Sequence, residues 1–127
     1  MKKANRISPQ SFLKSFGYAI KGLKSATCTE RNFQTHLLTV FAIIIIGFVL
    51  KIAPWEWVSI IFCFALVLGM ELINSSIEKL ADILIPEYNE KIGLVKDIAA
   101  GAVFICAIAA AVVGAIIFIP KLLFVSF

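Results

Sequence analysis

The sequence is poor in the residues and motifs that mark most soluble nucleotide-binding and metal-binding proteins. Charged residues make up only 16% of its 127 residues, against about 25% in an average soluble domain. The three cysteines, Cys28, Cys63 and Cys106, form no closely spaced pair, and there is one histidine. This pattern argues against a disulfide framework and a zinc site. The chain also has no GxxxxGK[ST], HRD or DFG motif, which excludes the common soluble ATP-binding classes.

Long apolar runs dominate the sequence instead. Hydrophobic residues make up 61% of the chain and the mean hydropathy is +0.97, well above the roughly 45–50% apolar share of soluble domains. Three runs are long enough to cross a bilayer, at about residues 33–51, 57–82 and 98–119. We therefore predict an all-α integral membrane protein in which residues 1–127 form a single domain.

Two connections are expected between these runs. Residues 51–57, which include Pro54, are predicted to form a tight turn, and residues 83–95 are predicted to form a polar loop. Pro120 is expected to end the last helix, because proline lacks the backbone donor that helices need.

Most of the positive charge lies near the N-terminus. Seven of the 12 Lys and Arg residues come before residue 32: Lys2, Lys3, Arg6, Lys14, Lys21, Lys24 and Arg31. By the positive-inside rule the N-terminus is expected in the cytoplasm and the C-terminus outside. Apolar residues at three-to-four spacing predict a basic amphipathic surface helix over about residues 9–27, next to anionic lipid rather than nucleic acid. The first 36 residues hold no apolar run, so no cleavable signal peptide is expected.

One face of the second apolar run carries polar side chains. A helix turns about 100° per residue, so Glu71, Asn74, Glu78 and Asp82 lie within a sector of about 80°. An ionisable residue inside a membrane costs at least about 2.5–3.5 kcal/mol, so it marks a candidate functional site. The alternative, strongest for Asp82, is that the helix has already left the membrane and these acids are simply in water.

The acidic residues suit a particular kind of chemistry. Carboxylates without His or Cys pairs favour Mg²⁺, which usually binds through one or two carboxylates and the phosphates of a substrate. A carboxylate at the level of the lipid is placed to accept a proton from a lipid hydroxyl, and Lys96 is available to a phosphate. Phosphoryl transfer at the membrane surface is therefore favoured. A proton-coupled transporter that uses a buried Glu71 and a non-catalytic membrane subunit remain alternatives.

The last apolar run indicates that helices pack closely together. It carries small residues four positions apart: Ala102, Cys106, Ala110 and Gly114. Such stripes let helix backbones approach one another in lipid. Three helices can hardly shield several carboxylates from lipid, so we expect a homo-oligomer.

Five sequence blocks together resemble the prokaryotic diacylglycerol kinase family, which includes undecaprenol kinases. They are Gly17–Leu23, Thr29–Asn32, Gly69–Glu78, Pro86–Tyr88 and Lys96–Val103, and the resemblance runs from about residue 12 to residue 120. It implies a homotrimeric enzyme of the bacterial cytoplasmic membrane that transfers the γ-phosphate of MgATP to a lipid alcohol, at a site facing the cytoplasm. The second and fifth blocks look closer to the undecaprenol kinases, but the choice between diacylglycerol and undecaprenol stays open.

The resemblance also implies roles for individual residues. Glu71 would be the general base and Asn74 would lie beside it in the lipid site. Glu30 and Glu78 would hold Mg²⁺. The nucleotide site would be lined by eight residues: Tyr18, Glu30, Glu78, Glu87, Tyr88, Asn89, Lys96 and Asp97. Asn89 stands where the family often has a histidine, and no role is implied for Asp82.

Overall fold

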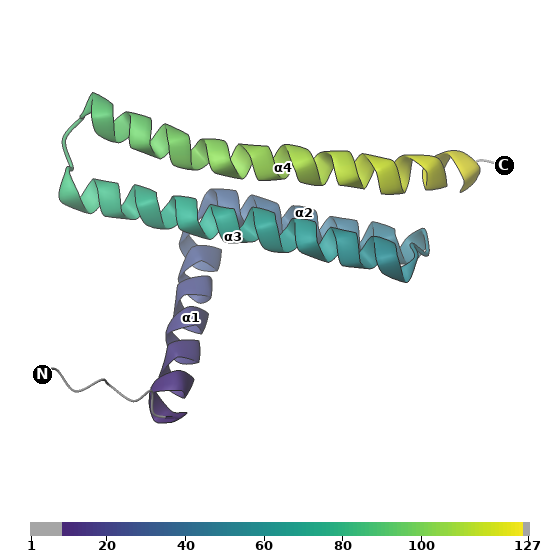
Figure 1. Cartoon of the computed structure of the whole chain (residues 1–127), viewed down its shortest axis with the longest axis horizontal. Coiled ribbons are helices and arrows are strands. Elements are labelled where there is room, and N and C mark those ends of the chain that lie inside the picture. Colours follow the sequence, from purple (N-terminus) through teal and green to yellow (C-terminus); the bar gives the residue numbers. More distant parts are fainter. Residues whose placement is uncertain (1–8, 126–127) are drawn as a thin grey trace, which may run out of the picture.

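The computed structural model describes residues 9–125 as four helices (Figure 1). They are α1 (Pro9–Thr29), α2 (Arg31–Val49), α3 (Pro54–Leu84) and α4 (Glu90–Val125). The basic residues Lys2, Lys3 and Arg6 lie outside the described residues. Helices α2, α3 and α4 are each long and apolar enough to cross a membrane. The prediction of an all-helical membrane protein with three helices able to span a membrane is therefore confirmed, while the limits of the membrane-embedded segments within these helices stay predictions.

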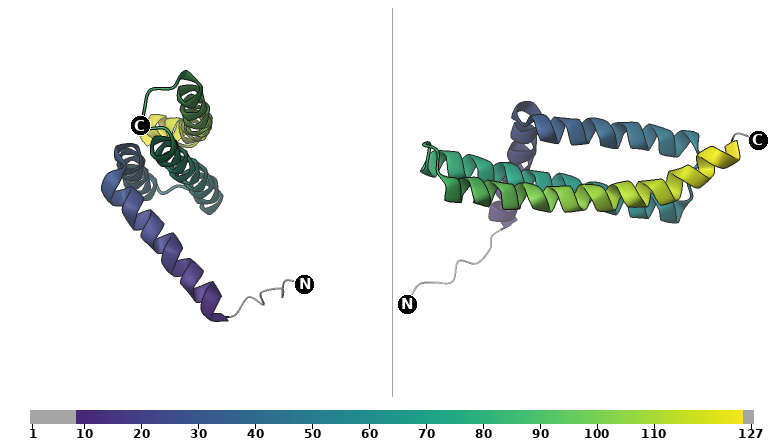
Figure 2. Two further views of the ribbon diagram at one scale, coloured as in Figure 1. Left: turned by 90° about the vertical axis from the view of Figure 1, so that its left-hand side faces the viewer. Right: turned by 90° about the horizontal axis from the view of Figure 1, so that it is seen from above.

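The three long helices run side by side, and α1 projects away from them at a steep angle, starting from the end of the bundle where α2 begins (Figure 1). α3 packs most extensively against α4 and less extensively against α2, whereas α1 meets only α2 and α3. The same arrangement is visible down the bundle in Figure 2. In Figure 1 the ends of α3 and α4 extend past the level of α1. A position of α1 in the membrane surface, and assembly into a homotrimer, stay predictions.

A tight turn at residues 50–53 joins α2 to α3 and differs from the predicted turn at residues 51–57. Pro54 begins α3 instead of lying in the turn, because the first helical position needs no backbone donor. The Ala53 N–H donates to the Glu56 carboxylate over 2.6 Å, which closes the first turn. Lys51 has a positive φ of 50°, and a Cβ on Gly47 would lie 2.8 Å from the Trp57 ring. This end of the bundle, here called the turn end, is closely packed.

The apolar core lies at the turn end. Its buried residues are Ile52, Ile60 and Ile117, from the turn, α3 and α4. Nearby, the Lys121 Nζ of α4 forms an ion pair with the buried Glu56 carboxylate of α3, at 3.1 Å. The ion pair and the apolar contacts together tie α4 to α3 at this end.

The connection between α3 and α4 is shorter than predicted. Residues 83–95 were expected to form a polar loop, but α3 continues to Leu84 and α4 begins at Glu90. The reason is a cap: the Asn89 side-chain oxygen accepts hydrogen bonds from the N–H groups of Lys91 and Ile92, at 3.0 and 3.3 Å, and so starts a helix in a polar segment. The end of the bundle that holds residues 85–89 is called the loop end below.

The prediction that Pro120 ends the last helix is also wrong. The helix continues through Pro120 to Val125. A proline inside a helix removes one backbone hydrogen bond and bends the axis, and Figure 2 shows α4 bending in its yellow C-terminal part.

Candidate functional site

A cluster of polar side chains is buried on α3 near the loop end. Glu71 is 2% exposed and Asn74 is 3% exposed, and Ser75 beside them is also buried. The Asn32 side chain, from the start of α2, lies next to the Glu71 carboxyl group. His36, Glu78 and Glu30 are further neighbours of Glu71. The predicted residues Glu71, Asn74, Glu78 and Glu30 are thus brought together, and Glu71 and Asn74 are withdrawn from solvent.

Asn74 leaves one strong acceptor unused. Its Nδ2 donates to the Glu78 carboxylate over 3.0 Å. Within residues 9–125, its buried Oδ1 has no hydrogen-bond partner. A buried polar atom without a partner costs about 1–3 kcal/mol, so this oxygen is suited to a donor that comes from outside the described chain.

Glu30 lies between α1 and α2 and is paired with a lysine of α3. The Lys79 Nζ lies 2.7 Å from the Glu30 carboxylate, and the Thr29 hydroxyl donates to the same oxygen over 2.8 Å. These two hydrogen bonds, with the positive charge of Lys79, lower the pKa of Glu30. Glu30 is therefore ionised at neutral pH, as a ligand of a cation must be.

Lys96 also pairs with an acid of α3. Its Nζ forms an ion pair with Asp82, and the pair connects the last turns of α3 to the first turns of α4. The Lys96 side chain is partly covered and Asp82 is exposed. Asp82 is thus exposed on the single chain, whereas Glu71 is buried in protein. That Asp82 is in water stays a prediction.

The remaining predicted residues lie on the surface. Tyr18 in α1 is exposed, as are Asp97 in α4 and the loop residues Glu87 and Tyr88. Asn89 caps α4 with its side-chain oxygen. Among the described residues, none of these five makes a hydrogen bond or an ion pair with the buried cluster, so the single chain does not bring them to it.

Sequence reasoning missed three partners of the cluster. Asn32 and His36 come from α2, and Lys79 lies on α3 beside the acidic face. The spacing within one helix indicates which residues share a face, but it carries no signal for contacts between helices. Lys79 in particular looks like an ordinary charged residue at the end of a span.

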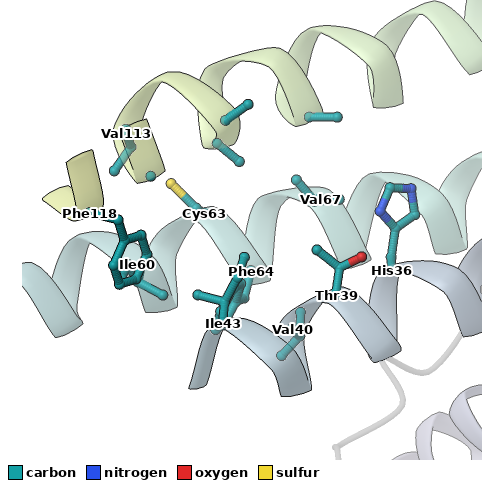
Figure 3. Close-up of a pocket in the computed structure, with 14 residues that line it drawn as sticks. His36, Thr39, Val40, Ile43, Ile60, Cys63, Phe64, Val67, Val113 and Phe118 are labelled. Atoms are coloured by element: carbon teal, nitrogen blue, oxygen red, sulfur yellow. The ribbon is translucent and has the colours of Figure 1, made fainter. Parts of the chain in front are cut away.

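An apolar cavity of about 340 Å³ lies between α2, α3 and α4. Figure 3 shows His36 and Thr39 from α2 at one part of its wall, with Val67 of α3 opposite and Val113 and Phe118 of α4 further toward the turn end. His36 is also a neighbour of Glu71. The cavity is therefore an apolar space whose polar corner is close to the buried carboxylate.

The carboxylates do not form a complete metal site on their own. Among residues 9–125, no group of three or more His, Cys, Asp or Glu side chains is arranged to hold a metal ion. Glu30 and Glu78 both lie near Glu71, and the unpaired Asn74 Oδ1 adds an oxygen atom. Mg²⁺ usually takes one or two carboxylates and completes its shell with water and phosphate oxygens. The donors present fit an Mg²⁺ that arrives with a nucleotide.

Comparisons with known proteins agree on one family. The family model for prokaryotic diacylglycerol kinase matches residues 17–118. The chain is similar to an undecaprenol kinase of Bacillus subtilis, with 35% identity over 94% of this chain and 98% of that protein. It is also similar to a diacylglycerol kinase of Synechocystis, with 36% identity over 96% of this chain and 70% of that protein. A diacylglycerol kinase of Escherichia coli is 33% identical over 79% and 82% of the two chains.

Proposed function

The chain belongs to the prokaryotic diacylglycerol kinase family and is a lipid kinase, and from this we propose that it transfers the γ-phosphate of MgATP to the hydroxyl group of a membrane lipid. The observation that carries the proposal is the buried Glu71 beside Asn74, with Glu30 and Glu78 adjoining it. A transporter that uses Glu71 would also need a buried carboxylate, but it would need neither these further acids nor Lys96.

The reaction divides between the residues as follows. The oxygen of the lipid hydroxyl attacks the γ-phosphorus, the bond to the β-phosphate oxygen breaks, and ADP leaves. Glu71 takes the proton of the hydroxyl, as a general base. Asn74 lies beside Glu71 and would line the lipid site, where its unpaired Oδ1 is available to a further donor. Diacylglycerol and undecaprenol are both apolar lipids with one alcohol, and the cavity next to His36 is suited to their hydrocarbon.

Glu30 and Glu78 would hold the Mg²⁺ that accompanies ATP. When bound, this ion neutralises charge on the phosphates. Lys96, with the loop residues Glu87 and Tyr88, would face the nucleotide. The proposed nucleotide site also includes Tyr18, Asn89 and Asp97. Most of these residues are exposed in one chain, which is compatible with a site completed by a neighbouring subunit of a homotrimer.

Undecaprenol is the proposed acceptor, with diacylglycerol as the second candidate. The similarity to the Bacillus undecaprenol kinase extends over almost the full length of both proteins. The test uses purified protein in mixed micelles with labelled ATP and each lipid in turn. We expect label in undecaprenol, at a rate well above that for diacylglycerol. A faster reaction with diacylglycerol would reverse the choice of lipid. If neither lipid becomes labelled, whether or not ATP is hydrolysed, the proposed kinase reaction is contradicted.

The proposed orientation places the loop end in the cytoplasm of a bacterial cell and the turn end outside. We expect a reporter that folds only outside the cytoplasm to be active when fused after Phe124, because α4 starts in the cytoplasm and crosses once. The matched control is the same reporter fused within the loop, after Glu87, where it should be inactive. The opposite pair of results would place the acidic cluster on the outer side, where ATP is absent.

A further inference from the structure

Asp82 carries no role in the reaction described above, yet it pairs with a residue that does. Its carboxylate forms an ion pair with Lys96 between α3 and α4. A second interhelical pair, Glu56 with Lys121, joins the same two helices at the turn end. The two pairs differ in setting: Glu56 is buried, whereas Asp82 is exposed at the loop end.

The position of Asp82 on α3 determines where the Lys96 ammonium lies. Asp82 is four residues beyond Glu78, so it is about 6 Å further along the axis and within about 40° of the same face. The Lys96 Nζ, in contact with Asp82, is therefore held roughly one helical turn from the carboxylate proposed to hold Mg²⁺. The triphosphate of ATP can bind Mg²⁺ through one phosphate group and an ammonium through the next. It can therefore bridge the distance of about one helical turn between Glu78 and Lys96.

A lysine side chain that is free to move loses up to about 1.5–2 kcal/mol of rotamer entropy when it is fixed. A partner that already fixes it removes part of that cost from nucleotide binding. The negative charge of Asp82 also repels phosphate, but an exposed charge is strongly screened by water and salt. Orienting Lys96 therefore favours nucleotide binding, against a repulsion that screening weakens.

We propose that Asp82 is a positioning residue that orients the Lys96 ammonium toward the phosphates of the nucleotide. This inference rests on the proposed function, because it requires that Lys96 contacts the nucleotide. It predicts an effect on nucleotide binding with little effect on the chemical step, since Asp82 lies 11 residues from Glu71 along α3.

The experiment measures the dissociation constant of a non-hydrolysable ATP analogue with Mg²⁺, on the full chain in lipid nanodiscs. Asp82→Ala should weaken binding about 3–10-fold, and Asp82→Asn, which keeps the shape but not the charge, should weaken it less. In a kinase assay the same variants should raise KM for MgATP with kcat within about twofold. Glu56→Gln is the matched control: it removes the other α3–α4 pair, and it should lower the melting temperature without changing nucleotide affinity.

A double-mutant cycle with Lys96→Gln separates the possible outcomes. If Asp82 acts through Lys96, then Asp82→Ala should add little to the loss caused by Lys96→Gln. Equal losses from Asp82→Ala in both backgrounds would contradict the positioning role. Tighter binding in Asp82→Ala would also contradict it, because Asp82 would then compete with phosphate for Lys96. If Lys96→Gln itself leaves affinity unchanged, the nucleotide role of Lys96 in the proposed function fails, and the inference fails with it.

Discussion

Glu71→Gln is expected to reduce kcat by about 10²–10⁴, the usual loss when a general base is removed. Glutamine keeps the shape of the side chain and can still accept a hydrogen bond, but it cannot take the proton of the lipid hydroxyl. The variant should fold, because a neutral amide is less costly to bury than a carboxylate, and Glu71 is only 2% exposed. The measurement is steady-state phosphorylation of the lipid in mixed micelles.

The same experiment separates chemistry from nucleotide binding. Glu78 lies seven residues further along α3, about 10 Å away along the axis, so KM for MgATP should change little in Glu71→Gln. The control is Glu56→Gln, which neutralises another buried carboxylate of the same helix but lies at the turn end. It should keep a near-normal kcat. A raised KM with an unchanged kcat in Glu71→Gln would move Glu71 to the nucleotide site and make Asp97 the next candidate base.

Glu30→Gln and Glu78→Gln are each expected to raise the Mg²⁺ concentration needed for activity by at least about 10–100-fold. Metal affinity falls by this factor even when the residue changed only hydrogen-bonds to a metal ligand. Each substitution replaces a charged oxygen ligand with a neutral amide. In Glu30→Gln the Lys79 ammonium also loses its partner at 2.7 Å, which leaves an extra positive charge beside the cation.

Activity measured over a range of Mg²⁺ concentrations tests both variants. Glu90→Gln is a suitable control, because it removes one exposed carboxylate from the first turn of α4 and should not change the Mg²⁺ requirement. Size-exclusion chromatography should show that the oligomer is intact. A variant that keeps near-normal activity at low Mg²⁺ would show that its residue is not a ligand.

The fold and the centre of the site could be predicted from the sequence because both depend on local patterns. Apolar runs of sufficient length identified all three spanning helices. A rotation of about 100° per residue placed Glu71, Asn74 and Glu78 on one face, and the structure has Asn74 and Glu78 hydrogen-bonded to each other.

The contacts between helices could not be predicted in this way. The pairs Lys79–Glu30 and Lys96–Asp82 join residues 49 and 14 positions apart, so their partners depend on how the helices are packed. The segment around Asn89 was misread because its polarity suggested a loop, whereas the capping oxygen of Asn89 starts a helix there. The assembly of several chains is a property that one chain does not contain.

The unbroken length of α3 has a consequence for the depth of the reaction in the membrane. Its 31 residues measure about 46 Å, more than the roughly 30 Å of a hydrocarbon core. Glu71, Glu78 and Asp82 therefore lie at fixed heights along one rigid rod, about 10 and 6 Å apart. If Glu71 is the base, its position on α3 sets the height at which the lipid hydroxyl is needed. The bilayer sets the height at which the hydroxyl actually lies. A thinner or thicker bilayer shifts one height against the other, so we expect the rate of phosphorylation to depend on membrane thickness.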